Sequence, residues 1–137
     1  MDDKEFSGRT ALVTGGSRGI GRAICQKLGE CGARVAINYV VNQRAAEETY
    51  QAIGEAGGSA AIYQADVSDP DQTSDMFDTI ENDLGPVDLL VTNAGIARSA
   101  DSISMTTETW QEIMRTNLDG TFYQVWRAKD GMIKRGY

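Results

Sequence analysis

The residues best suited to chemistry form a glycine-rich turn, Thr14-Gly15-Gly16-Ser17-Arg18-Gly19-Ile20-Gly21, between an apolar run and a helical pattern. Such a turn leaves backbone N–H groups pointing outward at a helix start, where the helix dipole also favours an anion. Glycine permits positive φ and lets a ligand approach the backbone closely. The pattern predicts a phosphate-binding loop, and a plain strand–helix turn is the alternative.

Two common phosphate loops do not fit this turn. Gly16 and Gly21 have the glycine spacing of a P-loop, but Arg22 and Ala23 stand where that loop has a lysine and a hydroxyl. The GxGxxG dinucleotide fingerprint also fails, because the glycines here fall at Gly15, Gly19 and Gly21.

Three further polar positions follow apolar patterns. Asp66-Val67 and Asn93-Ala94-Gly95 each come directly after a short apolar run, and Asn117 lies within the apolar stripe of a long helical pattern. A solvated carboxylate, a strand-ending turn and a satisfied core amide are their respective alternatives. A buried amide needs hydrogen-bond partners, and nearby Gly120 would favour a helix kink there.

The elements that must position these residues alternate between strand and helix. Apolar runs and glycine or proline stops predict strands at 11–14, 34–38, 59–65 and 87–92, and helices at 20–31, 44–56, 70–84 and 107–135. Asp69 is the expected N-cap of the third helix, with Pro70 at its first position. The order predicts one α/β domain, a parallel sheet covered by helices, with ligands at the carboxyl ends of the strands.

Composition excludes several classes of protein. The 137 residues carry 13 Lys plus Arg and 20 Asp plus Glu, a net charge of −7, with 2 Cys and no His. Without His, a Ser-His-Asp triad or the usual zinc sites cannot form within the chain, so we expect no metal. The acidic charge argues against a nucleic-acid partner. The polar start and the lack of long apolar runs predict no membrane partner and a cytoplasmic location.

Taken together, the motifs resemble the short-chain dehydrogenase/reductase family, and most of all its 3-oxoacyl-carrier-protein and acetoacetyl-CoA reductases. The resemblance spans essentially the whole chain in the right order, although Thr92 stands where the family usually has Asn. It implies an NAD(P)(H) site on a Rossmann-type fold. The residues that it assigns to this site are Gly15, Ser17, Arg18, Gly19, Ile20 and Gly21 in the loop, Asp66 and Val67 at the adenine, and Asn93, Ala94 and Gly95 at the riboses. Asn117 would be a catalytic position that helps to place a lysine.

The choice of cofactor is predicted from charge. An acidic residue at the end of the second strand would bind the ribose 2′-hydroxyl and repel a 2′-phosphate. Here the predicted strand ends at neutral Asn38, followed by Tyr39. Arg18 can reach the same phosphate, and Arg44 is a weaker second choice. We therefore expect NADP(H) rather than NAD(H); a solvated Arg18 is the alternative.

The family's Tyr-x-x-x-Lys pair and serine are missing from these residues. Tyr123 and Arg127 have the spacing, but Arg does not deprotonate at useful pH, so we interpret the match as coincidence. We expect residues 1–137 to be one NAD(P)-binding domain, incomplete at its C-terminus, with strand order 3-2-1-4 and truncated before strand five. The expected function is NADPH-dependent reduction of a 3-oxoacyl thioester or similar carbonyl, with little activity for this chain alone. A non-catalytic NADP(H)-binding or subunit-pairing module is the alternative.

This strand order would expose apolar surface. Strand 87–92 becomes an edge, and exposed apolar edges invite pairing with another chain. The last predicted helix carries a stripe of large apolar residues: Trp110, Ile113, Met114, Leu118, Phe122, Val125, Trp126, Met132 and Ile133. We expect self-association, a homo-oligomer formed through this helix.

Overall fold

A computed structural model describes residues 5–98 and 101–136. Its strands are β1 (Thr10–Val13), β2 (Arg34–Tyr39), β3 (Ser59–Gln64) and β4 (Val87–Val91). Its helices are α1 (Gly19–Glu30), α2 (Gln43–Glu55), α3 (Pro70–Leu84), α4 (Thr107–Met114) and α5 (Gly120–Arg135), with a π-helical segment, η1 (Arg115–Asp119), between the last two.

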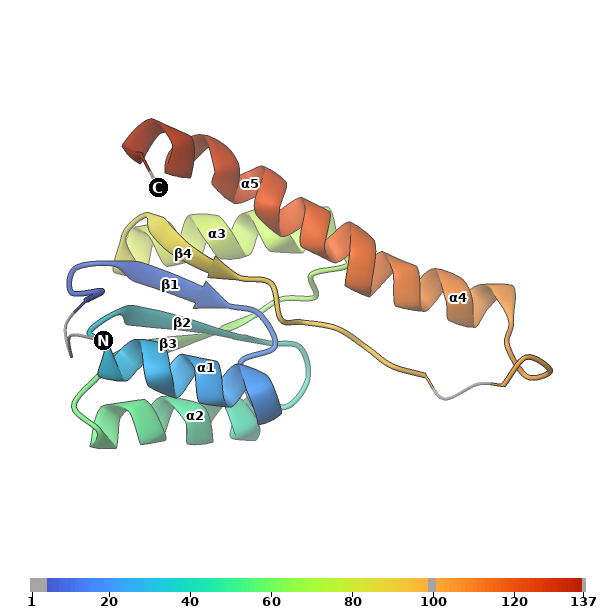
Figure 1. The fold of residues 1–137 in the computed structure, drawn as a ribbon, viewed down its shortest axis with the longest axis horizontal. Helices are drawn as coiled ribbons and strands as arrows, with labels where there is room; N and C mark the ends of the chain where they lie inside the picture. The colour runs from blue at the N-terminus through green and yellow to red at the C-terminus, as the bar shows by residue number, and fades with distance from the viewer. Residues whose placement is uncertain (1–4, 99–100, 137) are drawn as a thin grey trace.

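The four strands form a parallel sheet in the order β3-β2-β1-β4. Helices α1 and α2 lie on one side of this sheet, and α3 and α5 lie on the other (Figure 1). The predicted α/β fold and strand order are therefore confirmed, and β4 is an edge of the described sheet as expected.

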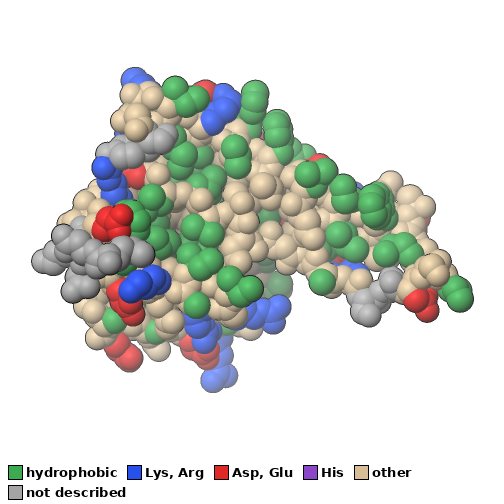
Figure 2. All heavy atoms as spheres, in the orientation of Figure 1, with side chains coloured by type: hydrophobic (Ala, Val, Ile, Leu, Met, Phe, Trp, Pro, Cys, Tyr) green, Lys and Arg blue, Asp and Glu red, His purple; other side chains and the backbone are tan. Residues whose placement is uncertain are grey.

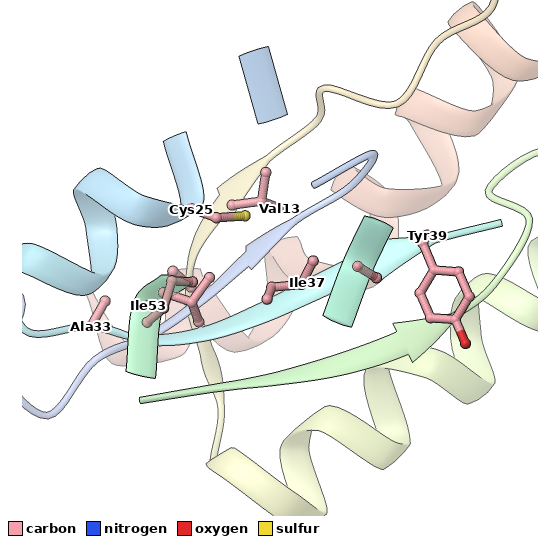
Figure 3. Close-up of a cluster of buried hydrophobic side chains, with 9 residues drawn as sticks. Val13, Cys25, Ala33, Ile37, Tyr39 and Ile53 are labelled. Carbon is pink, nitrogen blue, oxygen red and sulfur yellow. The ribbon is translucent and has the colours of Figure 1, made fainter. Parts of the chain in front are cut away.

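Alternate residues of the central strands supply two cores. Val13, Val35 and Ile37 pack with α1 and α2, whereas Leu12 and Ala36 pack with α3 and α5. Figure 3 shows the first cluster, in which Cys25 lies close to Val13. All four residues of β1 are buried, as expected for a central parallel strand that is covered on both faces.

Local signals fixed most helix ends. Asp69 is the N-cap of α3, and its carboxylate accepts hydrogen bonds from the amides of Asp71 and Gln72 at 2.9 and 3.2 Å. Pro70 occupies the first helical position, as predicted. Several predicted strand boundaries differ from the structure by one residue, and β2 in particular continues through Tyr39 and does not stop at Asn38.

The helical stretch predicted from 107 to 135 is present, and a π-helical segment interrupts its α-helical pattern. The chain passes from α4 through η1 into α5, and α4 extends away from the sheet (Figure 1). A π-helical turn accommodates a local irregularity and often marks a functional position. Here it contains Asn117 and ends just before Gly120, where the kink was expected.

The inner face of the last helix carries small residues and one buried amide side chain. Its buried residues are Gly120, Gln124 and Ala128, spaced four apart. Gly120 lies so close to the loop between β3 and α3 that an added Cβ would be 3.0 Å from the Val67 carbonyl oxygen. Most large apolar residues of the stripe are exposed, as expected, although Met132 packs against the core. Figure 2 shows hydrophobic side chains along the arm formed by α4 and the start of α5. Those more than half exposed are Trp110, Leu118, Phe122, Trp126 and Ile133.

Burial of Cys25 leads to a testable pH dependence. Its side chain is 0% exposed, and desolvation raises the pKa of the thiol from 9.0 to about 12. A raised pKa gives stability that is complete below the unfolded value and is lost as pH rises toward the folded value. Between pH 9 and 12 this contribution falls by about 1.4 kcal/mol per pH unit.

We therefore expect Cys25→Ala to reduce the slope of unfolding free energy against pH between 9 and 12, as measured by urea unfolding. The variant is less stable at neutral pH because it leaves a small cavity. Equal slopes for the two proteins would contradict the account of Cys25 burial.

Candidate functional site

The glycine turn forms an open backbone surface at the start of α1. Gly15 and Gly19 have positive φ values of 63° and 56°, and a Cβ at Gly19 would meet no atom within 4 Å. A Cβ at Gly21, by contrast, would lie 2.1 Å from the Gly15 carbonyl oxygen. Glycine is therefore required at Gly21 by close packing and at Gly15 and Gly19 by backbone conformation.

The turn after β4 is tied directly to this glycine turn. The Asn93 side-chain amide donates to the carbonyl oxygens of Thr14 and Gly15 at 3.0 and 3.1 Å. The Ala94 amide donates to the Thr14 hydroxyl at 3.2 Å. The two motifs predicted to share a site are thus brought together by hydrogen bonds at adjacent strand ends.

A buried hydrogen bond connects the same place to α5. The Thr14 hydroxyl donates to the Gln124 side-chain oxygen at 2.9 Å, and both residues are 0% exposed. The Gln124 amide in turn donates to the Gly120 carbonyl at 3.0 Å. Since buried polar groups must be paired, this contact fixes α5 against the ends of β1 and β4.

Asn38 supports the glycine turn from beneath. It is 0% exposed, its side-chain oxygen accepts from the Gly15 amide at 3.2 Å, and its amide donates to the Ala65 carbonyl at 3.0 Å. The buried Asn38 side chain therefore supports the turn, and Tyr39 is the residue at the strand end.

Asp66 and Val67 follow β3 at the same end of the sheet. The Asp66 carboxylate accepts from the amide and hydroxyl of Ser68 at 2.9 and 2.7 Å, so it holds its own loop. Val67 is 1% exposed, and its side chain packs near Gly120. A side-chain contact from Val67 to an adenine is not available in this arrangement, whereas Asp66 is partly exposed.

Asn117 is exposed and not buried as expected. Both ends of its amide are nevertheless paired with one residue, because the oxygen accepts from the Ile96 amide at 2.8 Å and the nitrogen donates to the Ile96 carbonyl at 2.9 Å. The π-helical segment therefore holds the chain that leads away from the Asn93-Ala94-Gly95 turn.

The remaining loop residues differ in exposure. Arg18 and Ile20 are exposed, with Ile20 at 75%, whereas Ser17 is buried and directs its carbonyl oxygen toward α2. The Arg18 side chain lies at the N-terminus of α1, on the solvent side of the turn.

Sequence reasoning missed the supporting residues Gln124, Arg22 and Thr49. The clue for Gln124 was its place between Gly120 and Ala128, since small residues four apart mark a helix face that approaches the sheet closely. The structure supports the interpretation of Tyr123 and Arg127 as coincidence. The Arg127 guanidinium bonds the carboxylates of Asp78 and Glu81 at 2.7 and 3.1 Å on α3.

Residues 5–98 and 101–136 hold no group of three or more His, Cys, Asp or Glu side chains arranged to bind a metal ion. Within these ranges, no helix combines the length and the apolar character needed to cross a membrane.

A parallel sheet in the order 3-2-1-4, with a glycine turn after its first strand, defines a Rossmann-type domain. Residues 9–137 match the short chain dehydrogenase family, and the chain belongs to this family. The resemblance inferred from the motifs is confirmed.

Three comparisons describe how close the similarity is. The chain is 46% identical over 129 residues to an acetoacetyl-CoA reductase of Rhizobium meliloti (strain 1021), covering 94% of the chain and 52% of that protein. It is 40% identical over 131 residues to 3beta-hydroxysteroid dehydrogenase 1 of Eggerthella lenta, and the match covers 96% of the chain and 50% of that protein. A short chain dehydrogenase of Burkholderia cenocepacia J2315, solved in complex with NADP, superposes on this chain with a TM-score of 0.87 and 34% sequence identity. The match covers 91% of this chain and 51% of that one.

The chain therefore spans about half the length of the curated relatives that it matches. Both relatives are oxidoreductases by name, and their names give different substrates.

The close packing at Gly21 gives a direct test of the site. We expect Gly21→Ala to disrupt the turn, because the new Cβ would overlap the Gly15 carbonyl and press on the Asn93 amide, 2.7 Å away. In a fluorescence titration the Gly21→Ala protein should no longer bind a dinucleotide, and its melting temperature should be lower than that of the unmodified chain.

Gly54→Ala is the matched control, because a Cβ there meets no atom within 4 Å on an exposed helix position. It should raise stability by about 1 kcal/mol and leave binding unchanged. A Gly21→Ala protein that binds and melts like the unmodified chain would contradict the proposed packing of the turn.

Proposed function

We propose that the protein is an NADP(H)-dependent oxidoreductase that reduces a 3-oxoacyl thioester or a similar carbonyl, and that this chain is one incomplete domain that supplies its cofactor-binding half. The observation that carries the proposal is the hydrogen-bonded union of the glycine turn with the Asn93 turn at the carboxyl ends of β1 and β4. The 46% identity to an acetoacetyl-CoA reductase supports the substrate class.

The residues present fit a dinucleotide. A Cβ at Gly19 would meet no atom within 4 Å, so a pyrophosphate could approach the backbone there, whereas a side chain would block it. The 12-residue α1 begins at the same residue, and the positive end of its dipole favours an anion. Gly15, Ser17, Arg18, Gly19, Ile20 and Gly21 would hold the pyrophosphate, and Asn93, Ala94 and Gly95 would line the riboses. Asp66 would contact the adenine from its partly exposed position after β3.

The preference for NADP(H) rests on charge at the end of β2. The last strand residue is Tyr39, the next exposed residues are Val40 and Val41, and none carries a negative charge. A 2′-phosphate would meet no repulsion there, and the exposed guanidinium of Arg18 is available to pair with it.

The cofactor would supply a hydride to the carbonyl carbon of the substrate. This chain's residues would bind and orient, with Asn117 keeping the segment after β4 in place through both Ile96 bonds. The 137 residues contain no Tyr-x-x-x-Lys pair to donate the proton that the carbonyl oxygen requires. We therefore propose that the chain alone binds nucleotide without turnover.

A non-catalytic module is the second candidate, favoured by that same missing pair. In this case the chain would bind NADP(H) or pair with a related subunit. Both candidates predict that this chain binds NADPH without oxidising it, so this chain cannot distinguish them. The test therefore uses the whole protein of which we propose this chain is one part, with acetoacetyl-CoA as substrate. Oxidation of NADPH by it supports the reductase, and nucleotide binding without oxidation supports the module.

Arg18 tests the cofactor preference. In fluorescence titrations the unmodified chain should bind NADPH more tightly than NADH. Arg18→Ala should weaken NADPH binding about tenfold or more, because one charge-assisted contact with the 2′-phosphate is lost, and should change NADH binding little.

Arg44→Ala is the control, since Arg44 is almost fully exposed and pairs with Glu48 on α2. It should have a smaller effect than Arg18→Ala. Equal affinities of the unmodified chain for NADH and NADPH, or an unchanged preference in Arg18→Ala, would contradict the assignment.

We also propose a homo-oligomer through the last helix and a cytoplasmic location. Exposed Phe122 and Trp126 stack at 5.3 Å between ring centroids, and an apolar groove lined by Leu90, Val125 and Met132 runs beside the edge strand. Removing this surface from water favours association. Sedimentation should show a dimer or larger species that Trp126→Glu dissociates, whereas a single monomer boundary for the unmodified chain would contradict it.

A further inference from the structure

The guanidinium of Arg22 lies behind the glycine turn. Its Nε and Nη2 atoms donate to the Ser17 carbonyl oxygen at 3.1 and 2.8 Å. The Thr49 hydroxyl, from α2, lies within hydrogen-bond distance of the same oxygen, at 3.0 Å. Three donor groups thus converge on one backbone carbonyl of the loop.

The same guanidinium is held firmly by α2. Nη2 also reaches the Ala45 carbonyl at 3.1 Å and the Glu48 carboxylate at 3.2 Å, and Nε contacts the Thr49 hydroxyl at 3.0 Å. Thr49 is 0% exposed, and the Arg22 side chain is 32% exposed. A planar guanidinium with several donors in a fixed arrangement suits such a role better than an ammonium group would.

This arrangement fixes the direction of the next amide. The described chain has no cis peptide bonds, and in a trans peptide the carbonyl and the following N–H point in opposite directions. Because the Ser17 carbonyl is drawn toward α2, the Arg18 N–H must point away from α2. Arg18 is exposed and is the N-cap of α1, so this amide lies at the start of that helix.

We infer that Arg22 is a positioning residue of the cofactor site, which turns the Arg18 amide toward the bound pyrophosphate without touching it. The inference rests on the proposed function. It also means that α2 takes part in shaping the turn, since Ala45, Glu48 and Thr49 hold the guanidinium in place.

A purely structural role for Arg22 makes a different prediction. The Arg22–Glu48 ion pair is partly exposed, and an exposed pair of this kind stabilises a protein little. If Arg22 only joined α1 to α2, its removal would lower the melting temperature and leave the affinity for nucleotide unchanged. Affinity and stability therefore have to be measured on the same variants.

The test uses Arg22→Met, Arg22→Lys and Thr49→Val in the full chain, with NADPH titration and thermal melting. Arg22→Met should weaken NADPH binding about tenfold or more, Arg22→Lys should recover part of the loss, and Thr49→Val should weaken binding about threefold. In the nucleotide-free chain, Arg22→Met should also shift the Arg18 amide resonance in NMR spectra.

Arg127→Met is the matched control, because Arg127 also bridges two helices through carboxylates but lies on the opposite side of the sheet. It should lower the melting temperature and leave the NADPH affinity unchanged.

An Arg22→Met protein that folds and binds NADPH like the unmodified chain overturns the inference. If that variant does not fold, unchanged affinity in both Arg22→Lys and Thr49→Val does so. An unmodified chain that binds neither NADPH nor NADH contradicts the proposed function itself, and is recognised before any variant is made.

Discussion

The structure depends on satisfying buried polar groups where β1, β2 and β4 end. At this edge the backbone leaves the sheet, so its amides and carbonyls lose their ladder partners and need others. Thr14, Asn38 and Asn93 supply them with hydroxyl and amide groups. Their bonds fix one turn against the other, and the open side of that pair of turns is where the proposed cofactor would bind.

The last helix serves this arrangement from one face and exposes the other. Its inner face carries small residues and buried Gln124, whose bond to Thr14 ties the helix to the cofactor turns. Its outer face presents Phe122 and Trp126 to solvent. Close approach on the inside requires Gly120, because an added Cβ would lie 3.0 Å from the Val67 carbonyl. The inner face of this helix therefore contacts the cofactor turns, and its outer face leaves an apolar surface exposed.

The alternation of elements followed from the sequence, because glycine turns and apolar runs are local signals, and the strand order followed from the resemblance to the family. The α3 cap at Asp69 was predictable because it too is a local signal. The burial of Asn38, the exposure of Asn117 and the role of Arg22 were not, since each depends on partners far along the chain. The exposed apolar stripe of the last helix was expected, whereas its inner face was not: close packing against the sheet selected Gly120, Gln124 and Ala128 there.

The central claim is that the two turns act together as one nucleotide site. Its most direct test is an NMR titration of the chain with NADPH, following the backbone amide resonances. The account predicts that amides of residues 15–21 and 93–95 shift together with one dissociation constant, while those at the far ends of the strands stay unchanged. Shifts confined to one turn, or located elsewhere on the chain, would contradict it.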